Sequence, residues 1–189
     1  MTRIALLLLA LLLPAVAAAE SYQIDVIVFL QGGADGESPL PQQTIDSSHA
    51  LEPEQTDALR NVGIHVLQEG GLGETLHNLQ ASGHRYDPVA HLSWIQDNPP
   101  DGRGPVLHIT GGNLVDTPLG SVHSLDGTLS LHGGFYLHVD ADLSWTQHMA
   151  DGSIVSWRLS ENRRLRLNEI HYLDNAKLGM IARVTRRDG

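Results

Sequence analysis

The stretch FYLHVDADLSWTQHM, residues 135–149, alternates between apolar and polar side chains. Its odd-numbered positions from Phe135 to Trp145 are apolar, and the positions between them carry hydroxyl, imidazole or carboxylate groups. A strict period of two over such a length is typical of a β-strand with one buried face. We therefore predict a long strand here, with its polar face in solvent.

The sequence ADG at 150–152 must return the chain as a hairpin, and the length of this turn decides the strand pairing. A two-residue turn would set Trp157 opposite Thr146 and mix apolar with polar side chains. A three-residue turn with Gly152 in the left-handed conformation keeps one face apolar. We predict this second register, which pairs Trp145 with Trp157, Leu143 with Leu159 and Leu137 with Leu165.

Other periodic segments add strands and one helix to this hairpin. Residues 22–30 are apolar on both faces, as in a central strand, and we expect them beside a last strand at 180–184. Residues 72–82 place three leucines on one helical face. We predict an α+β fold, a single domain with a mainly antiparallel sheet of six or seven strands and the helix packed on it. The remaining predicted segments are strands at 86–96 and 106–110 and an irregular loop at 111–124.

The N-terminus has the pattern of a secretory signal peptide. Arg3 precedes an apolar run that is too short to span a bilayer, and small residues lead up to Ala19. We predict cleavage of a signal peptide, 1–19, which leaves one domain, 20–189, without a membrane span; the alternative is an uncleaved anchor. Glycines and prolines interrupt residues 32–53, where we predict a flexible insertion.

Composition excludes several classes of protein. The chain has no cysteine, which excludes disulfides, cysteine nucleophiles and thiolate metal sites. Its formal net charge of −10 makes nucleic acid a poor partner. Even so, eight of its twelve Lys and Arg residues lie between Arg158 and Arg187.

The predicted register gives some of these arginines partners within the sheet. Arg158 lies diagonal to Asp142, Arg164 lies opposite His138, and Arg166 follows on the same polar face. Cross-strand pairs of opposite charge stabilise a sheet by about 0.2–1 kcal/mol each. The arginines for which the sequence predicts no partner are Arg163, Arg183, Arg186 and Arg187.

Motifs for catalysis are missing from the sequence. It contains no G-x-S-x-G, H-E-x-x-H, P-loop or G-x-G-x-x-G pattern. His138 and Asp140 share one strand face with His148, but a zinc site needs three or four converging ligands, which spacing alone does not establish. Glu169 and Asp174 are an acid–base pair only if the fold brings them together. We predict neither catalysis nor a metal or cofactor.

Four stretches of the chain form a recognisable set of motifs: LDGTLSL and FYLHVDADL at 125–143, RRLR at 163–166 and EIHYLD at 169–174. Together they resemble the CsiV family of periplasmic peptidoglycan-binding proteins. The family continues the last motif with His-Pro, where this chain has Asn175 and Ala176. The resemblance implies a periplasmic protein of Gram-negative bacteria. It would bind peptidoglycan and act with a lipoprotein activator of a bifunctional penicillin-binding protein.

We therefore predict a non-catalytic peptidoglycan-binding protein that supports cell-wall synthesis. Arginine forks bind carboxylates in two-point contacts, and tyrosine rings offer a face to sugars. The alternatives are an adaptor that binds only protein, a metal-dependent hydrolase, and arginines that merely pair with Asp140 and its neighbours. The predicted ligand-binding residues are Arg164, Arg166, Tyr136, His138, His171 and Tyr172.

Overall fold

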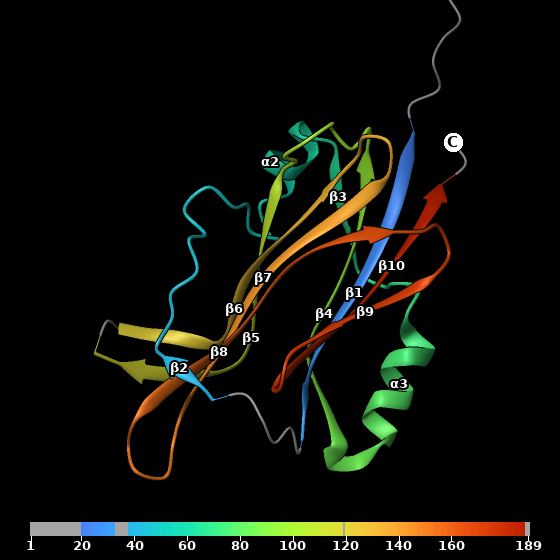
Figure 1. Cartoon of the computed structure of the whole chain (residues 1–189). Helices are drawn as coiled ribbons and strands as arrows, with labels where there is room; N and C mark the ends of the chain where they lie inside the picture. Colours follow the sequence, from blue (N-terminus) through green and yellow to red (C-terminus); the bar gives the residue numbers. More distant parts are fainter. Residues whose placement is uncertain (1–19, 33–37, 119, 188–189) are drawn as a thin grey trace, which may run out of the picture.

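The computed structural model describes residues 20–32, 38–118 and 120–187, and these form two antiparallel sheets (Figure 1). Sheet A has the order β3-β4-β1-β10-β9, and sheet B has the order β2-β8-β7-β6-β5. A single apolar core contains side chains of both sheets. The strands are β1 Ser21–Gln31, β2 Leu40–Pro41, β3 Ile64–Leu67, β4 Tyr86–Asp97, β5 Val106–Thr117, β6 Gly120–His132, β7 Leu137–His148, β8 Ile154–Leu165, β9 Ile170–Asp174 and β10 Leu178–Arg187; the helices are α2 Thr56–Asn61, α3 Gly73–Ala81 and the 3₁₀ turn η2 Gly83–Arg85.

The predicted hairpin is confirmed in sheet B. Trp145 lies opposite Trp157 and Leu137 opposite Leu165, and Gly152 has a φ of 84°. This positive φ is the left-handed conformation that the three-residue turn requires. The α+β class is confirmed as well, and β1 lies beside β10 as predicted.

The prediction of six or seven strands is wrong, because the described residues form ten strands. Part of the error lies at 111–124, where we predicted an irregular loop. This segment extends β5 and begins β6, with an irregular register between Gly111 and Leu114. Gly112, at a φ of 70°, lies so near the Trp145 ring that an added Cβ would come within 3.0 Å of it. The glycines that suggested a loop thus serve a bulge over a buried tryptophan.

The apolar and polar faces of the hairpin differ less in burial than the alternating pattern predicted. Trp157 is only partly buried, whereas Trp145 is 9% exposed. On the polar face, Thr146 and Ser156 are buried and hydrogen-bonded to each other at 2.9 Å. The backbone N–H of Gln43 donates to Ser156 at 3.1 Å. Part of the segment predicted as a flexible insertion therefore packs on sheet B.

Helix α3 covers the outer face of sheet A. It spans nine residues inside the predicted range 72–82. Leu72, just before the helix, packs with Ile27, Phe29 and Ile181 in a second apolar cluster. Strand β1 is therefore buried on both faces, by sheet B on one side and by α3 on the other.

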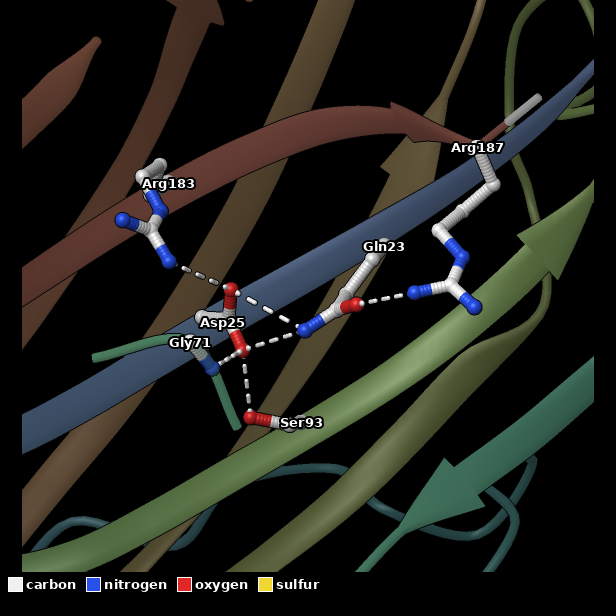
Figure 2. A network of polar contacts seen from close by, with 6 residues as sticks. All are labelled: Gln23, Asp25, Gly71, Ser93, Arg183 and Arg187. Atoms are coloured by element: carbon white, nitrogen blue, oxygen red, sulfur yellow. Dashed lines mark hydrogen bonds and ion pairs between the residues drawn. The ribbon is translucent and has the colours of Figure 1, made fainter. Parts of the chain in front are cut away.

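A buried charge joins the central strand of sheet A to its neighbours (Figure 2). Asp25 of β1 has no exposed surface, and it accepts hydrogen bonds from the Ser93 hydroxyl of β4 and the Gly71 N–H, both at 2.7 Å. The Arg183 guanidinium of β10 lies 3.4 Å away. A Cβ at Gly71 would collide with that guanidinium, so the loop before α3 approaches closely only because glycine stands there.

These partners set the protonation of Asp25. Burial alone raises the pKa of a carboxyl, but the hydrogen bonds from Ser93, Gly71 and Gln23, with the cation of Arg183, bring the pKa of Asp25 below its ordinary value. Asp25 is therefore ionised in the folded protein at neutral pH.

The unequal burial of the two tryptophans predicts unequal losses of stability. We expect Trp145→Ala to lower the free energy of unfolding by about 3–5 kcal/mol, the usual cost of emptying a buried aromatic site. Because Trp157 is partly exposed, Trp157→Ala should lower the free energy of unfolding by less, about 0.5–3 kcal/mol. Urea unfolding of both variants measures the difference, and equal losses would contradict the burial described here.

Asp25→Asn should destabilise the protein in a pH-dependent way. At pH 7 we expect a loss of about 1.5–3 kcal/mol in the free energy of unfolding, because a neutral amide forms weaker hydrogen bonds than a carboxylate and leaves Arg183 without its counterion. The folded-state pKa lies below the unfolded value, so the contribution of the carboxylate is complete above the unfolded pKa and disappears as pH falls through the folded pKa. Urea unfolding should show that the difference in unfolding free energy between Asp25→Asn and wild type becomes smaller toward pH 3.

A control for this prediction is Asp57→Asn, because the Asp57 side chain is 93% exposed. It should change stability little at either pH. A gap between Asp25→Asn and wild type that stays constant with pH would refute the role given to the charge.

Candidate functional site

A cleft of about 600 Å³ opens at one end of the core, where β8 ends and β7 begins. Its walls come from four segments that are distant in sequence: Glu20 and Tyr22, the turn 98–101, residues 133–137 and residues 164–167. Three residues predicted to bind ligand line it, namely Tyr136, Arg164 and Arg166.

Backbone hydrogen bonds hold the cleft walls in place. Asn98, at a φ of 46°, donates its N–H to the Glu20 carbonyl at 2.7 Å, and its side-chain oxygen accepts from the Glu20 N–H at 3.1 Å. Gly133 donates to the Pro100 carbonyl at 2.8 Å. The turn after β4 is thereby tied both to the first strand and to the loop before β7.

Arg164 is the cation whose surroundings fit a binding role. Its guanidinium carbon lies 3.1 Å from the centre of the Tyr136 ring. Within the described part of the chain, the Arg164 side chain forms no ion pair or hydrogen bond, and the residue is exposed. Stacking on an aromatic face orients the guanidinium plane and leaves its N–H edge open.

Large apolar surface lies exposed beside this arginine. Phe135 is 93% exposed and lies in edge contact with Tyr136, which is 44% exposed. Leu167, in the same wall segment as Arg164, is 42% exposed. The cleft therefore offers a cation together with rings and an aliphatic side chain, the combination that binds an amphipathic ligand.

Arg166 and His171 lie next to each other at the rim. Strand β8 ends at Leu165, so Arg166 lies beyond the paired strand, and its side chain faces Glu169 at 3.7 Å. The backbone N–H of Arg166 donates to Nε2 of His171 at 2.9 Å. His171 thus fixes the path of the chain into the cleft, and its accepting nitrogen is already occupied.

The other two predicted ligand-binding residues do not line the cleft. His138 lies opposite Arg164 in the register of β7 and β8, as predicted, but its ring stacks on His132 and bonds to Asn162 at 2.8 Å. Tyr172 lies on the α3 side of sheet A, stacked on Phe29, and donates to Gln31 at 3.0 Å. Burial and the nearby Asp174 raise the pKa of Tyr172 to about 12.

The basic C-terminal region is mostly neutralised within the fold. The prediction that Arg163, Arg183, Arg186 and Arg187 lack partners is wrong. Three of them form ion pairs, and Arg187 donates to the neutral Gln23. These partners come from distant strands or from two residues away, which a single hairpin register does not reveal. The ion pairs are Arg163 with Glu161 at 3.0 Å, Arg183 with Asp25 at 3.4 Å and Arg186 with Glu20 at 2.9 Å.

On the polar face of sheet B, Asp140 and Asp142 contact side chains other than Arg164. Arg158 makes a two-point contact with Asp142, with both bonds at 2.7 Å, as the register predicted. Asp140 contacts His132 at 3.1 Å and also Asn162. The alternative that Arg164 pairs with Asp140 is therefore not what the structure shows.

Sequence reasoning missed the rest of the cleft. Phe135 was assigned to the apolar face of the strand, but β7 begins only at Leu137. The pair Gly133-Gly134, with Gly134 at a φ of 130°, marks the turn that releases Phe135 from the sheet. Tyr22 and Asp101 reach the cleft through tertiary contacts that no local pattern indicates.

Among the described residues, no group of three or more His, Asp or Glu side chains is arranged to hold a metal ion. His108 lies between two carboxylates, Asp126 at 2.6 Å and Glu52 at 2.7 Å. Burial alone lowers the pKa of His108, but these two carboxylates raise it above its ordinary value. No described helix is long and apolar enough to cross a membrane.

The comparison with protein families agrees with the motifs in the sequence. Residues 2–187 match the family model described as "Peptidoglycan-binding protein, CsiV". The chain belongs to the CsiV family. Comparisons with curated proteins and with solved structures gave no match.

The residues after the EIHYLD stretch form a turn. The side-chain oxygen of Asn175 accepts hydrogen bonds from the N–H groups of Lys177 and Leu178, at 2.8 and 2.7 Å. An asparagine that bonds its own backbone in this way stabilises a tight turn. Asn175 therefore supplies a local means of turning the chain from β9 into β10.

Arg164→Ala should leave the fold nearly as stable as wild type. An exposed cation–π contact contributes only about 0.5–1 kcal/mol. By contrast, Arg183→Ala removes the counterion of buried Asp25 and should cost about 3–5 kcal/mol. Thermal and urea unfolding of the two variants make the comparison. Equal destabilisation would mean that Arg164 has a structural role.

Proposed function

We propose that this protein is a non-catalytic periplasmic protein that binds peptidoglycan in the cleft at the end of β8. One observation carries the proposal. In a member of a family described as peptidoglycan-binding, Arg164 is stacked on Tyr136 in a cleft and has no partner among the described residues. Nearly every other arginine of the C-terminal region is engaged by a neighbour.

The composition of the cleft supports this ligand. Peptidoglycan combines sugar rings, which pack against aromatic faces, with short peptides that carry charged groups. Phe135 and Tyr136 provide the exposed rings, and Arg164 and Arg166 provide the positive charge. Polysaccharide is bound through such mixed contacts of stacking and hydrogen bonding.

The cellular setting follows from the family resemblance and from the N-terminal pattern. The proposal includes export by a signal peptide, residues 1–19, which lie outside the described residues. It also includes support of cell-wall synthesis together with a lipoprotein activator of a bifunctional penicillin-binding protein. This part rests on the resemblance, and a pull-down of the activator with the purified protein tests it.

The experiment for wall binding is co-sedimentation with purified sacculi. Wild type should sediment with the sacculi, and the double variant Arg164→Ala, Arg166→Ala should sediment at least about 10-fold less, since two charge-assisted contacts are removed. Rising salt should weaken wild-type binding, because exposed charges are screened.

The matched control is Arg60→Ala, Arg163→Ala. It removes the same net charge from two exposed arginines that pair with Asp57 and Glu161 outside the cleft. This control should bind like wild type. Failure of wild type to sediment would refute wall binding. If the folded Arg164→Ala, Arg166→Ala variant bound sacculi as well as wild type, the cleft would not be the binding site.

A further inference from the structure

We propose that the cleft recognises the peptide stems of peptidoglycan, through a free carboxylate, and not the glycan strand. The inference rests on the proposed function and names the part of the polymer that the cleft binds. Its basis is the set of unused hydrogen-bond donors of Arg164 and the negative charge of Asp101, which lines the same cleft.

The unused hydrogen-bond donors of Arg164 define the group that fits it. A guanidinium carries five N–H donors in a rigid plane. No described residue accepts from those of Arg164, while the Tyr136 ring, 3.1 Å from the guanidinium carbon, covers one face of the plane. The open edge therefore presents parallel N–H bonds. A carboxylate matches them with two oxygens at once, whereas a hydroxyl or an acetamide oxygen accepts at one point.

The two parts of peptidoglycan differ in this respect. The glycan strand carries hydroxyl and acetamide groups, and the lactyl carboxyl of its muramic acid is consumed in the amide bond to the stem. The stems carry the free carboxylates. A site whose distinguishing feature is an unpaired arginine fork in an acidic protein thus selects the stem.

A carboxylate in the wall of the cleft adds a second requirement. Asp101 lines the cleft and forms no ion pair within the described part of the chain. The other carboxylate of the wall, Glu20, is already engaged by Arg186 and by the Tyr22 hydroxyl. One free cation and one free anion in the same cleft complement a zwitterion. An uncross-linked diamino acid of a stem has this character, with an ammonium and a carboxylate.

The exposed rings account for the remainder of such a ligand. Phe135 and Tyr136 line the same cleft as the charged groups, and their exposed rings can cover the aliphatic part of a short peptide as well as a sugar. Stacking alone therefore does not choose between the two parts of the polymer, and the charges make the choice.

The test measures the Kd of the mature protein by calorimetry for three probes. They are a synthetic stem tetrapeptide that contains a diamino acid, the same peptide with its carboxylates converted to amides, and glycan strands freed of stems by an amidase. In the stripped glycan, the lactyl carboxyls that this cleavage releases are also converted to amides. We expect the free peptide to bind at least about 10-fold more tightly than the amidated one, because a charge-assisted pair is lost. The stripped glycan should not bind measurably.

Two variants make the outcome specific to the residues. Arg164→Lys keeps the charge but loses the fork, and it should bind the free peptide about 10-fold more weakly. Asp101→Asn should weaken binding of the free peptide but not of its N-acetylated form, in which all amines are blocked. Inorganic phosphate, added as a competitor, should displace the peptide poorly.

The results that would overturn the inference are distinct from those that refute wall binding. Sacculi that bind wild type, combined with stripped glycan that binds as tightly as the free peptide, would overturn the choice of the stem alone. Equal affinity for free and amidated peptide would do the same. If phosphate displaced the free peptide at concentrations near the Kd of that peptide, the cleft would be a general anion site and not a site for stems.

Discussion

The buried carboxylate of Asp25 is the constraint on which the arrangement of sheet A depends. Taking a charge out of water costs several kcal/mol even after a protein relaxes around it, so Asp25 must find its donors. They come from β4, from β10 and from the loop before α3, and they meet only when β1 lies between those two strands. Hydrophobic burial alone would tolerate other neighbours for an apolar strand. The charge makes this strand order specific.

Local patterns were sufficient for the hairpin of sheet B and insufficient for its surroundings. The register of β7 and β8 followed from one rule, that apolar side chains share a face, and from one glycine at the turn. The burial of Thr146 and Ser156 did not follow, because a segment about a hundred residues earlier covers them. Likewise, the glycines near residue 111 are typical of a loop in the sequence. In the structure, Gly112 instead lets the chain pass close to the ring of Trp145.

The candidate site shows the same division. Sequence reasoning reached Tyr136, Arg164 and Arg166, since they follow from the register of a single hairpin. It included His138 because the register sets it opposite Arg164, which the structure confirms, although His138 does not line the cleft. It included Tyr172 because that residue was taken to continue the same strand, whereas β8 ends at Leu165 and Tyr172 belongs to β9. It also took unpaired arginines to be common in the C-terminal region, whereas Arg183 and Arg186 find partners in β1 and just before it. Those partners come from the opposite end of the chain. The lack of a partner in the local sequence therefore does not indicate that an arginine is unpaired in the fold.

The pairing of β1 with β10 also bears on how the chain folds. Ser21 lies opposite Arg187, so this ladder closes a loop of nearly the whole chain. The entropy of closing such a loop is lost before its contacts stabilise anything, and sheets rich in distant contacts fold in about milliseconds to seconds. Sheet A thus stays incomplete until the last strand is available. A chain that ended before Leu178 would leave an apolar central strand with an open edge, and such edges are where chains aggregate.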